Sequence, residues 1–315
     1  MKKVVFILIL AFLLAPSAYC LTSGTWGDGV FWTLTDSGDL TVYGEGAMSD
    51  GCPLTDEQRE RVKSVTVRDG VTHIGKFAFS ELENLKIVTM SDSVVSVGNS
   101  AFYRCRQLEM IKLSDNVTQI SEHCFQGCTA LKTVHMPSQL LAIGLSVFTE
   151  CASLAEIELP AGLVVISDSA FNNCVSLKAA VIPPSVKLLG DDAFRGCTGM
   201  TELWFLGDMP ESGDYYRLNT VFADVTAVGH YPQNYSGWTN IENKSLGKSQ
   251  VNWKPYTMGD ADGDGRISEN DPIVAGLIAV TGAALSDDRL RLCDVDFSGA
   301  ITSHDLIAIA RLARQ

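Results

Sequence analysis

The feature that most constrains the fold of this chain is a repeat of 23 residues that runs through its middle. Three kinds of side chain recur at that step, in one common register. The aliphatic ladder is Leu85, Leu108, Leu131, Leu154, Leu177 and Met200, with Val62 one step earlier. The aromatic ladder is Phe79, Phe102, Phe125, Phe148, Phe171 and Phe194, and the thiol ladder is Cys105, Cys128, Cys151, Cys174 and Cys197. These ladders predict a solenoid, in which each repeat buries its apolar side by stacking on its neighbours.

The spacing of apolar residues predicts a strand in each repeat. In LKIVTMSDSVVSVGNSAFYRCRQ, residues 85–107, Val88 and Met90 stand two residues apart, as the buried residues of a β-strand do. Val94 and Val97 are the next inward candidates, followed by Phe102 and the cysteine of the same repeat. The expected fold class is therefore a β-rich solenoid of 23-residue repeats, with one rung per repeat.

The core of each repeat resembles the BspA-like class of leucine-rich repeats. That class has the pattern AFxxCxxL, found here as AFYRCRQL, AFNNCVSL and AFRGCTGM. The usual leucine-rich pattern has a fixed Asn or Cys after the strand, but this chain varies that position: Gly70, Ser93, Asn116, Gln139, Gly162 and Ser185. The resemblance covers residues 22 to about 257 and implies an N-terminal cap over 22–61 and repeats with a closing unit over 62–257.

The ladder cysteines are expected to be buried and unbridged. Stacked strands lie about 4.8 Å apart, but their Cβ vectors run parallel and do not converge as a disulfide requires. A zinc site at Cys124, Cys128 and His123 is the alternative. Because Cys128 belongs to the ladder, Cys124 takes the Ala position of the AF pair, and no second pair of ligands follows, we expect small buried hydrophobes.

The outward strand positions are the candidates for a binding face. They fall between the two inward residues of each strand and are Thr66, Thr89, Lys112, His135, Glu158, Val181 and Trp204. Their chemistry changes at every rung, which favours an irregular macromolecular ligand over a repetitive polymer; the alternative is an ordinary solvated face. No catalytic motif of the HExxH, GxSxG or phosphate-loop kind is present, and the histidines are scattered.

Charge and the N-terminus narrow the class of protein further. A net charge of -13 argues against nucleic acid as a partner, because such binding depends on clustered Lys and Arg. Residues 1–20 start with Lys2 and Lys3 and continue with twelve apolar residues from Val4 to Ala15. This run is shorter than the roughly 20 residues that span a bilayer, so a secretory signal peptide and an extracellular location are expected, with a buried first element as the alternative.

Two acidic loops near the C-terminus share the spacing of a calcium loop. DADGDGRISEND (260–271) and DVDFSGAITSHD (294–305) both have ligand residues at positions 1, 3, 5, 7, 9 and 12 and a glycine, Gly265 or Gly299, at position 6. Such loops bind calcium through hard oxygen ligands, so two Ca²⁺ ions are expected. The ligands of the first loop are Asp260, Asp262, Asp264, the Arg266 carbonyl, Ser268 and Asp271. Those of the second are Asp294, Asp296, Ser298, the Ala300 carbonyl, Thr302 and Asp305.

The two loops resemble a type I dockerin. Position 12 is Asp instead of the Glu of an ordinary EF-hand, and a helix is suggested only after each loop, at PIVAGLIAV and LIAIARLAR. The resemblance implies a small all-α calcium-binding domain over 258–315 and, as partner, a cohesin module of a scaffoldin in a cellulosome-like assembly. It also implies cohesin contacts at loop positions 10 and 11 and on the following helix: Glu269, Asn270, Ser303, His304, Ala310 and Arg311.

These features together predict a non-catalytic binding or adhesion subunit, docked through its C-terminus. The repeats would bind a protein or a cell-surface or plant-wall ligand, since they lack a recognisable catalytic set. Two alternatives remain open at this point. One is a cellulosomal enzyme with its site in the irregular regions 22–61 or 207–257, and the other is a host-directed adhesin anchored by the dockerin.

Overall fold

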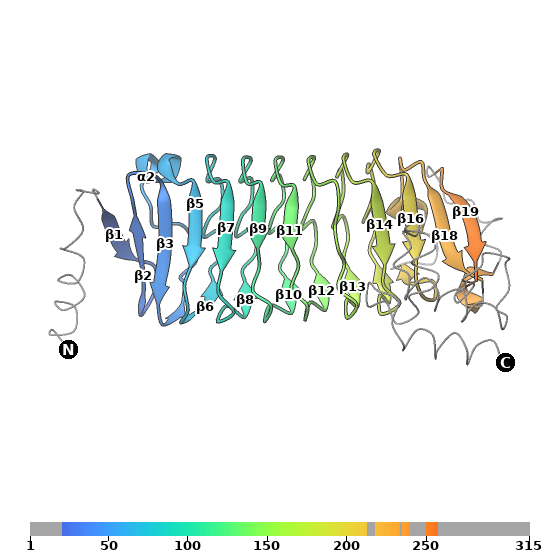
Figure 1. Cartoon of the computed structure of the whole chain (residues 1–315), viewed down its shortest axis with the longest axis horizontal. Helices are drawn as coiled ribbons and strands as arrows, with labels where there is room; N and C mark the ends of the chain where they lie inside the picture. The colour runs from blue at the N-terminus through green and yellow to red at the C-terminus, as the bar shows by residue number, and fades with distance from the viewer. Residues whose placement is uncertain (1–20, 213–217, 234, 240–249, 258–315) are drawn as a thin grey trace, which may run out of the picture.

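The structure is a computed structural model that describes residues 21–212, 218–233, 235–239 and 250–257. The expected signal peptide, both acidic loops and all six expected cohesin contacts lie outside these residues. The described residues form a solenoid of three sheets (Figure 1) with very little helix. The helical segments are α2 (Asp56–Arg61), α3 (Leu218–Val221) and the 3-10 turn η1 (Ser236–Trp238).

The first and third sheets carry the main strands of the repeats. The first sheet begins with two antiparallel pairs, β1 with β2 and β2 with β3, and continues with parallel pairs. Its strands are β1 (Thr22–Thr25), β2 (Val30–Leu34), β3 (Asp39–Gly44), β5 (Ser64–Val67), β7 (Ile87–Met90), β9 (Met110–Lys112) and β11 (Thr133–His135). The third sheet is parallel and contains β14 (Ala179–Ile182), β16 (Glu202–Phe205), β18 (Val228–Pro232) and β19 (Asn252–Tyr256).

The second sheet is built from the short strand that follows each main strand. Figure 1 shows several of these strands along the lower edge of the solenoid. In chain order they are β4 (Gly46–Ala47), β6 (Val71–Ile74), β8 (Ser96–Val97), β10 (Gln119–Ile120), β12 (Ala142–Ile143), β13 (Val165–Ile166), β15 (Leu188–Leu189) and β17 (Glu211–Ser212). The expected one-rung-per-repeat solenoid is thereby confirmed.

The aromatic ladder forms the centre of the core. The rings from Phe79 to Phe194 are fully buried and stack with centroids 5.1–5.4 Å apart and interplanar angles of 7–18°. Trp26 closes the stack edge-on at one end, with its centroid 5.0 Å from that of Phe79, and Phe222 continues it at the other end at 5.7 Å from Phe194. Because the rings stack at nearly the strand spacing, each repeat covers the phenylalanine of its neighbour.

The thiol ladder is buried and free, as expected. Each ladder cysteine donates its S–H to the carbonyl of a phenylalanine 26 residues earlier, at 3.0–3.3 Å. Among the described residues all seven cysteines carry free thiols. Burial raises the pKa of the Cys105 thiol to about 12, which leaves it protonated and unreactive at neutral pH.

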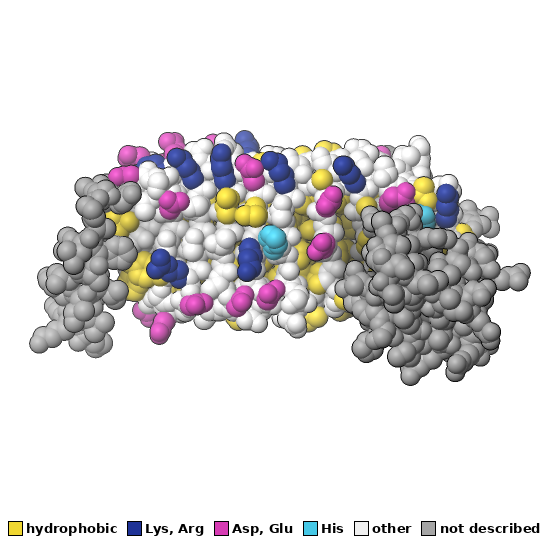
Figure 2. Space-filling view, viewed as in Figure 1, with side chains coloured by type: hydrophobic (Ala, Val, Ile, Leu, Met, Phe, Trp, Pro, Cys, Tyr) yellow, Lys and Arg dark blue, Asp and Glu magenta, His cyan; other side chains and the backbone are white. Residues whose placement is uncertain are grey.

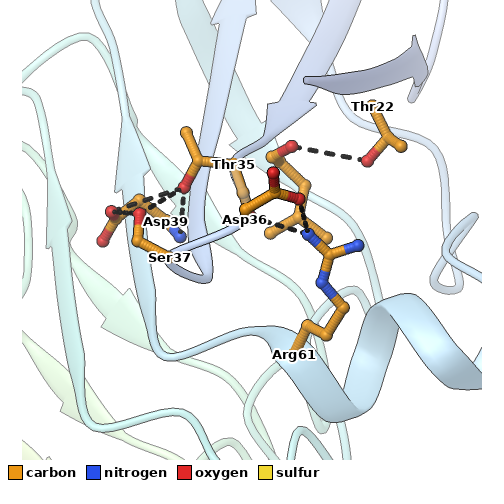
Figure 3. A network of polar contacts seen from close by, with 7 residues as sticks. Thr22, Thr35, Asp36, Ser37, Asp39 and Arg61 are labelled. Atoms are coloured by element: carbon orange, nitrogen blue, oxygen red, sulfur yellow. Dashed lines mark hydrogen bonds and ion pairs between the residues drawn. The ribbon is translucent and has the colours of Figure 1, made fainter. Parts of the chain in front are cut away.

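A polar network joins the first hairpin to the first repeat (Figure 3). Asp39 at the start of β3 accepts hydrogen bonds from Ser37 at 2.5 Å and from Ser64, in β5, at 2.6 Å. These donors hold the pKa of the Asp39 carboxyl below its usual value. Arg61 at the end of α2 pairs with Asp36 at 2.7 Å, so the helix is tied to the same turn.

The main ladder of strands is interrupted at one repeat. Residues 156–159, which we call the open rung, lie between β11 and β14 but form no strand, although a strand was expected around Glu158. In two other repeats the residue after the main strand donates its N–H to the preceding rung: Ser91 donates to Val67 and Leu206 to Ile182, each at 3.0 Å. At residues 137, 160 and 183 this position is proline, which has no N–H. Glutamate at two of the four positions also disfavours a strand.

Candidate binding face

The outward side chains of the first and third sheets form two rows, which we call the strand face. Pairing of the parallel strands fixes the register within each sheet, and the 23-residue step assigns Glu156 and Glu158 of the open rung to the same rows. The first row is Ser64, Ile87, Met110, Thr133, Glu156, Ala179 and Glu202. The second is Thr66, Thr89, Lys112, His135, Glu158, Val181 and Trp204. Apart from the Thr66–Thr89 pair, neighbouring side chains along the two rows are of different residue types, and no regular pattern of charge or polarity runs along the axis.

The two edges of the strand face carry opposite charges. Exposed lysines stand just before the strands and exposed aspartates just after them, and because the strands are parallel, each set lines up at one edge. Figure 2 shows a row of basic side chains along the upper part of this view and acidic side chains along the lower part. The lysines are Lys63, Lys86, Lys132 and Lys178, and the aspartates are Asp69, Asp92 and Asp115. Among the described residues, Lys132 forms an ion pair with Glu109 at 3.1 Å.

The lysine edge was not predicted, although the sequence holds the signal for it. Its four residues obey the 23-residue step, with Glu109 and Ala155 at the two intervening positions. Because Glu109 and Ala155 interrupt it, this row is less regular than the aliphatic, aromatic and thiol ladders.

The middle of the strand face is open and chemically mixed. Lys112 and His135 are neighbours in register and both are exposed, as expected from the sequence. On the first row, Ile87 is 42% exposed and lies beside Met110 in register. An apolar pair next to cationic side chains offers both area and orientation to a ligand.

At the C-terminal end of the repeats, side chains of the closing unit cover the strand face, so the expectation that Trp204 belongs to an open binding face is wrong. Trp204 points outward in register but is only 3% exposed. The His230 ring stacks on its indole with centroids 3.8 Å apart, and the Tyr256 ring lies 5.6 Å away. His230 Nε2 in turn lies 2.8 Å from a Glu202 carboxylate oxygen. His230 belongs to the irregular closing unit, so the 23-residue step could not place it over Trp204.

Two other described histidines form local hydrogen bonds, and the two cysteines considered as zinc ligands lie in the core. His73 shares a hydrogen bond with Ser96 at 2.7 Å, and His123 shares one with Gln126 at 2.8 Å. Cys124 and Cys128 are buried. No group of three or more His, Cys, Asp or Glu side chains that could hold a metal ion occurs in the described part of the chain. The same residues include no helix with the length and apolar character needed to cross a membrane.

Comparison with known proteins places the repeats in a family. The model of the BspA type leucine rich repeat region matches residues 57–178 and 129–227, in six copies. No curated protein matches the chain. A leucine-rich repeat protein of T. pallidum is 25% identical over 69% of this chain and 86% of that one, with a TM-score of 0.45. One from Bacteroides ovatus ATCC 8483 is 22% identical over 70% of this chain and 60% of that one, with a TM-score of 0.45.

A third solved structure is a leucine rich cell surface protein of Faecalibacterium prausnitzii A2-165. It is 16% identical over 76% of this chain and 96% of its own, with a TM-score of 0.35. The family match spans residues 57–227, more than half of the chain, and does not reach 258–315. The matched residues contain the aromatic and thiol ladders that form the core. The chain belongs to the BspA-type leucine-rich repeat family.

Proposed function

We propose that this protein is an exported, non-catalytic binding or adhesion subunit whose strand face holds a macromolecular partner. The observation that carries this proposal is the strand face itself, a chemically varied and partly exposed set of side chains on an array of stacked rungs. Side chains fixed on such an array lose little conformational entropy when a partner binds. Membership of this repeat family suggests the same role, since such repeats typically bind proteins.

The dimensions of the strand face suit a protein-sized partner. At about 4.8 Å per rung, the seven rungs from Ser64 to Glu202 extend about 30 Å, the scale of one side of an ordinary protein–protein interface. A short oligosaccharide would cover only a part of this surface.

The second half of the proposal is that residues 258–315 dock the protein to a cohesin module of a scaffoldin. Its support is the repeated calcium spacing in the sequence, with hard oxygen ligands at matching positions of both loops. Two bound Ca²⁺ ions would neutralise the acidic loops and let the following helices pack. Attachment to a cellulosome-like assembly outside the cell follows from this part of the proposal.

The strand face is tested by capturing its partner from a bacterial culture grown on plant-wall polysaccharide. The full-length mature chain is used as bait beside a Lys112→Glu/His135→Glu variant, which changes two exposed neighbours on the strand face. A Thr118→Glu/Gln119→Glu variant on the second sheet is the control. We expect the strand-face variant alone to lose the captured partner. Equal capture by all three chains contradicts the proposal.

Titration of cohesin modules tests the docking half. Binding in saturating calcium should vanish with chelator, and the Ser303→Asp/Arg311→Ala pair should weaken it by about thirtyfold if the second loop provides the main contacts. A larger loss from Glu269→Ala/Asn270→Ala would move the contact to the first loop. Absence of binding to every type I cohesin would contradict docking and leave the strand-face proposal intact.

A further inference from the structure

In the described part of the chain, the open rung interrupts the main ladder of strands, and its inward side chains are only partly buried. Among the described residues, no backbone group of residues 156–159 makes a hydrogen bond, whereas Lys178 still donates to the Ala155 carbonyl at 3.0 Å and Val164 to the Leu141 carbonyl at 2.8 Å. The repeat is therefore held at its corners while its front segment stays unpaired. Among the described residues, no strand pairs with β11 or β14 on the side that faces the open rung.

Apolar side chains that are buried in other repeats come to the surface here. In neighbouring repeats the first inward residue is 0–1% exposed, as in Val88, Ile111 and Ala180. The second is 1–5% exposed, as in Met90, Leu113 and Ile182. Around the open rung the same positions are only partly buried: Val134, Met136, Ile157 and Leu159. Figure 2 shows apolar surface in this part of the molecule, between the histidine at the centre and the third sheet.

The polar side chains at this place are anionic. Glu156 and Glu158 are both exposed and stand two residues apart on the same face, and neither forms an ion pair within the described part of the chain. No other described main-strand repeat from β5 to β14 has two like charges at its outward positions. A cationic partner would remove the mutual repulsion of these carboxylates, so charge complementarity selects lysine or arginine as the partner's side chains.

We propose that the open rung is where the strand face takes its partner, and that the partner is a polypeptide segment with an apolar side chain between lysines or arginines. The apolar side chain contacts Ile157 and Leu159, and the cations pair with Glu156 and Glu158. This inference rests on the proposed function, because it names the partner class for the strand face. An acidic polymer is excluded as the occupant by the same two carboxylates.

The test uses a synthetic decapeptide of alternating lysine and leucine as the probe, titrated against the full-length mature chain at physiological ionic strength. Decalysine lacks the apolar side chains, and alternating glutamate and leucine reverses the charge. The variant Glu156→Gln/Glu158→Gln removes both charges and keeps side-chain size. Its matched control is Asp92→Asn/Asp115→Asn, which changes net charge equally at the far edge of the same face and keeps the side-chain oxygen that accepts the Asp115 N–H.

We expect the lysine–leucine peptide to bind more tightly than either other peptide, and the glutamine pair to weaken it by about tenfold or more. The asparagine pair should change the affinity by less than about twofold. Equal weakening by both pairs, equal binding of decalysine, or no binding at all overturns the inference. If the Lys112→Glu/His135→Glu variant still loses its captured partner in that case, the proposed function stands and only the partner class falls. If that variant keeps its partner, the proposed function falls as well.

Discussion

At the scale of single residues, the core depends on identical side chains meeting across rungs. Phe148 is fully buried between Phe125 and Phe171, with ring centroids 5.4 and 5.2 Å away. Its backbone carbonyl also accepts the S–H of Cys174 at 3.1 Å. One phenylalanine therefore touches both neighbouring repeats, and its loss affects three rungs.

Phe148→Ala should lower the free energy of unfolding by about 3 to 5 kcal/mol, because the substitution leaves a cavity inside the aromatic stack. Lys112→Ala, on the exposed strand face, should change it by less than about 0.5 kcal/mol. Urea unfolding of both variants provides the comparison. Equal shifts of the two midpoints would show that the inward and outward positions of the 23-residue repeat have been assigned incorrectly.

Asp39 should make stability depend on pH at the acidic end. Hydrogen bonds from Ser37 and Ser64 lower the pKa of its folded-state carboxyl, so its contribution is present above the unfolded pKa near 3.8 and disappears as pH falls through the folded value. The stability difference between the wild-type chain and Asp39→Asn should therefore shrink below about pH 4, and it should stay under about 1 kcal/mol because the group is exposed. Urea midpoints at several pH values measure it. A difference that grows on acidification would contradict this assignment.

At the scale of elements, the 23-residue step predicted almost every main strand and failed at two places for physical reasons. The two-residue spacing of apolar side chains predicted that Val88 and Met90 point inward, and both are buried in the structure. The step could not reveal the open rung, because Ile157 and Leu159 keep the apolar spacing of the paired repeats. The missing N–H of Pro160 and the glutamates on either side of Ile157 both disfavour pairing, although Pro137 and Pro183 follow strands that do pair. Nor could the step place His230 on Trp204, since the closing unit departs from it. The acidic loops lie outside the described residues, so their calcium sites stay a prediction.

Pro160→Ser should restore pairing at the open rung. Serine supplies the N–H that proline lacks, as Ser91 does at the equivalent position, and the Met136 carbonyl is the expected acceptor. Amide hydrogen exchange of peptides spanning 153–163 should slow by about tenfold in the variant, while exchange over 85–95 stays unchanged. A variant with unchanged exchange in both regions would mean that the glutamates alone keep the rung open.

At the scale of the whole molecule, we assign partner binding to the solenoid and attachment to the C-terminal residues. The described solenoid is stabilised by burial of its stacked rungs, and its cysteines are free thiols. Residues 259–315 hold ten acidic but only five basic residues, so the excess carboxylates are expected to repel one another until a metal binds. Stability should therefore depend on calcium only in the C-terminal part.

Chelator should leave the main unfolding transition of the full-length chain within about 1 °C of its position in calcium, because the solenoid core uses no metal in this account. It should remove a smaller helical signal, followed by circular dichroism near 222 nm. A shift of the main transition by several degrees would mean that calcium also stabilises the repeats.

The most direct test of the central claim is hydrogen–deuterium exchange of the full-length chain with and without its captured partner. We predict slower exchange in peptides that contain the strand face, over 85–92, 108–115 and 131–138, and in the open rung at 153–160. Peptides that contain only the second sheet, such as 116–122 and 139–145, should not change. Protection confined to the second sheet would contradict the claim that the strand face is the binding surface.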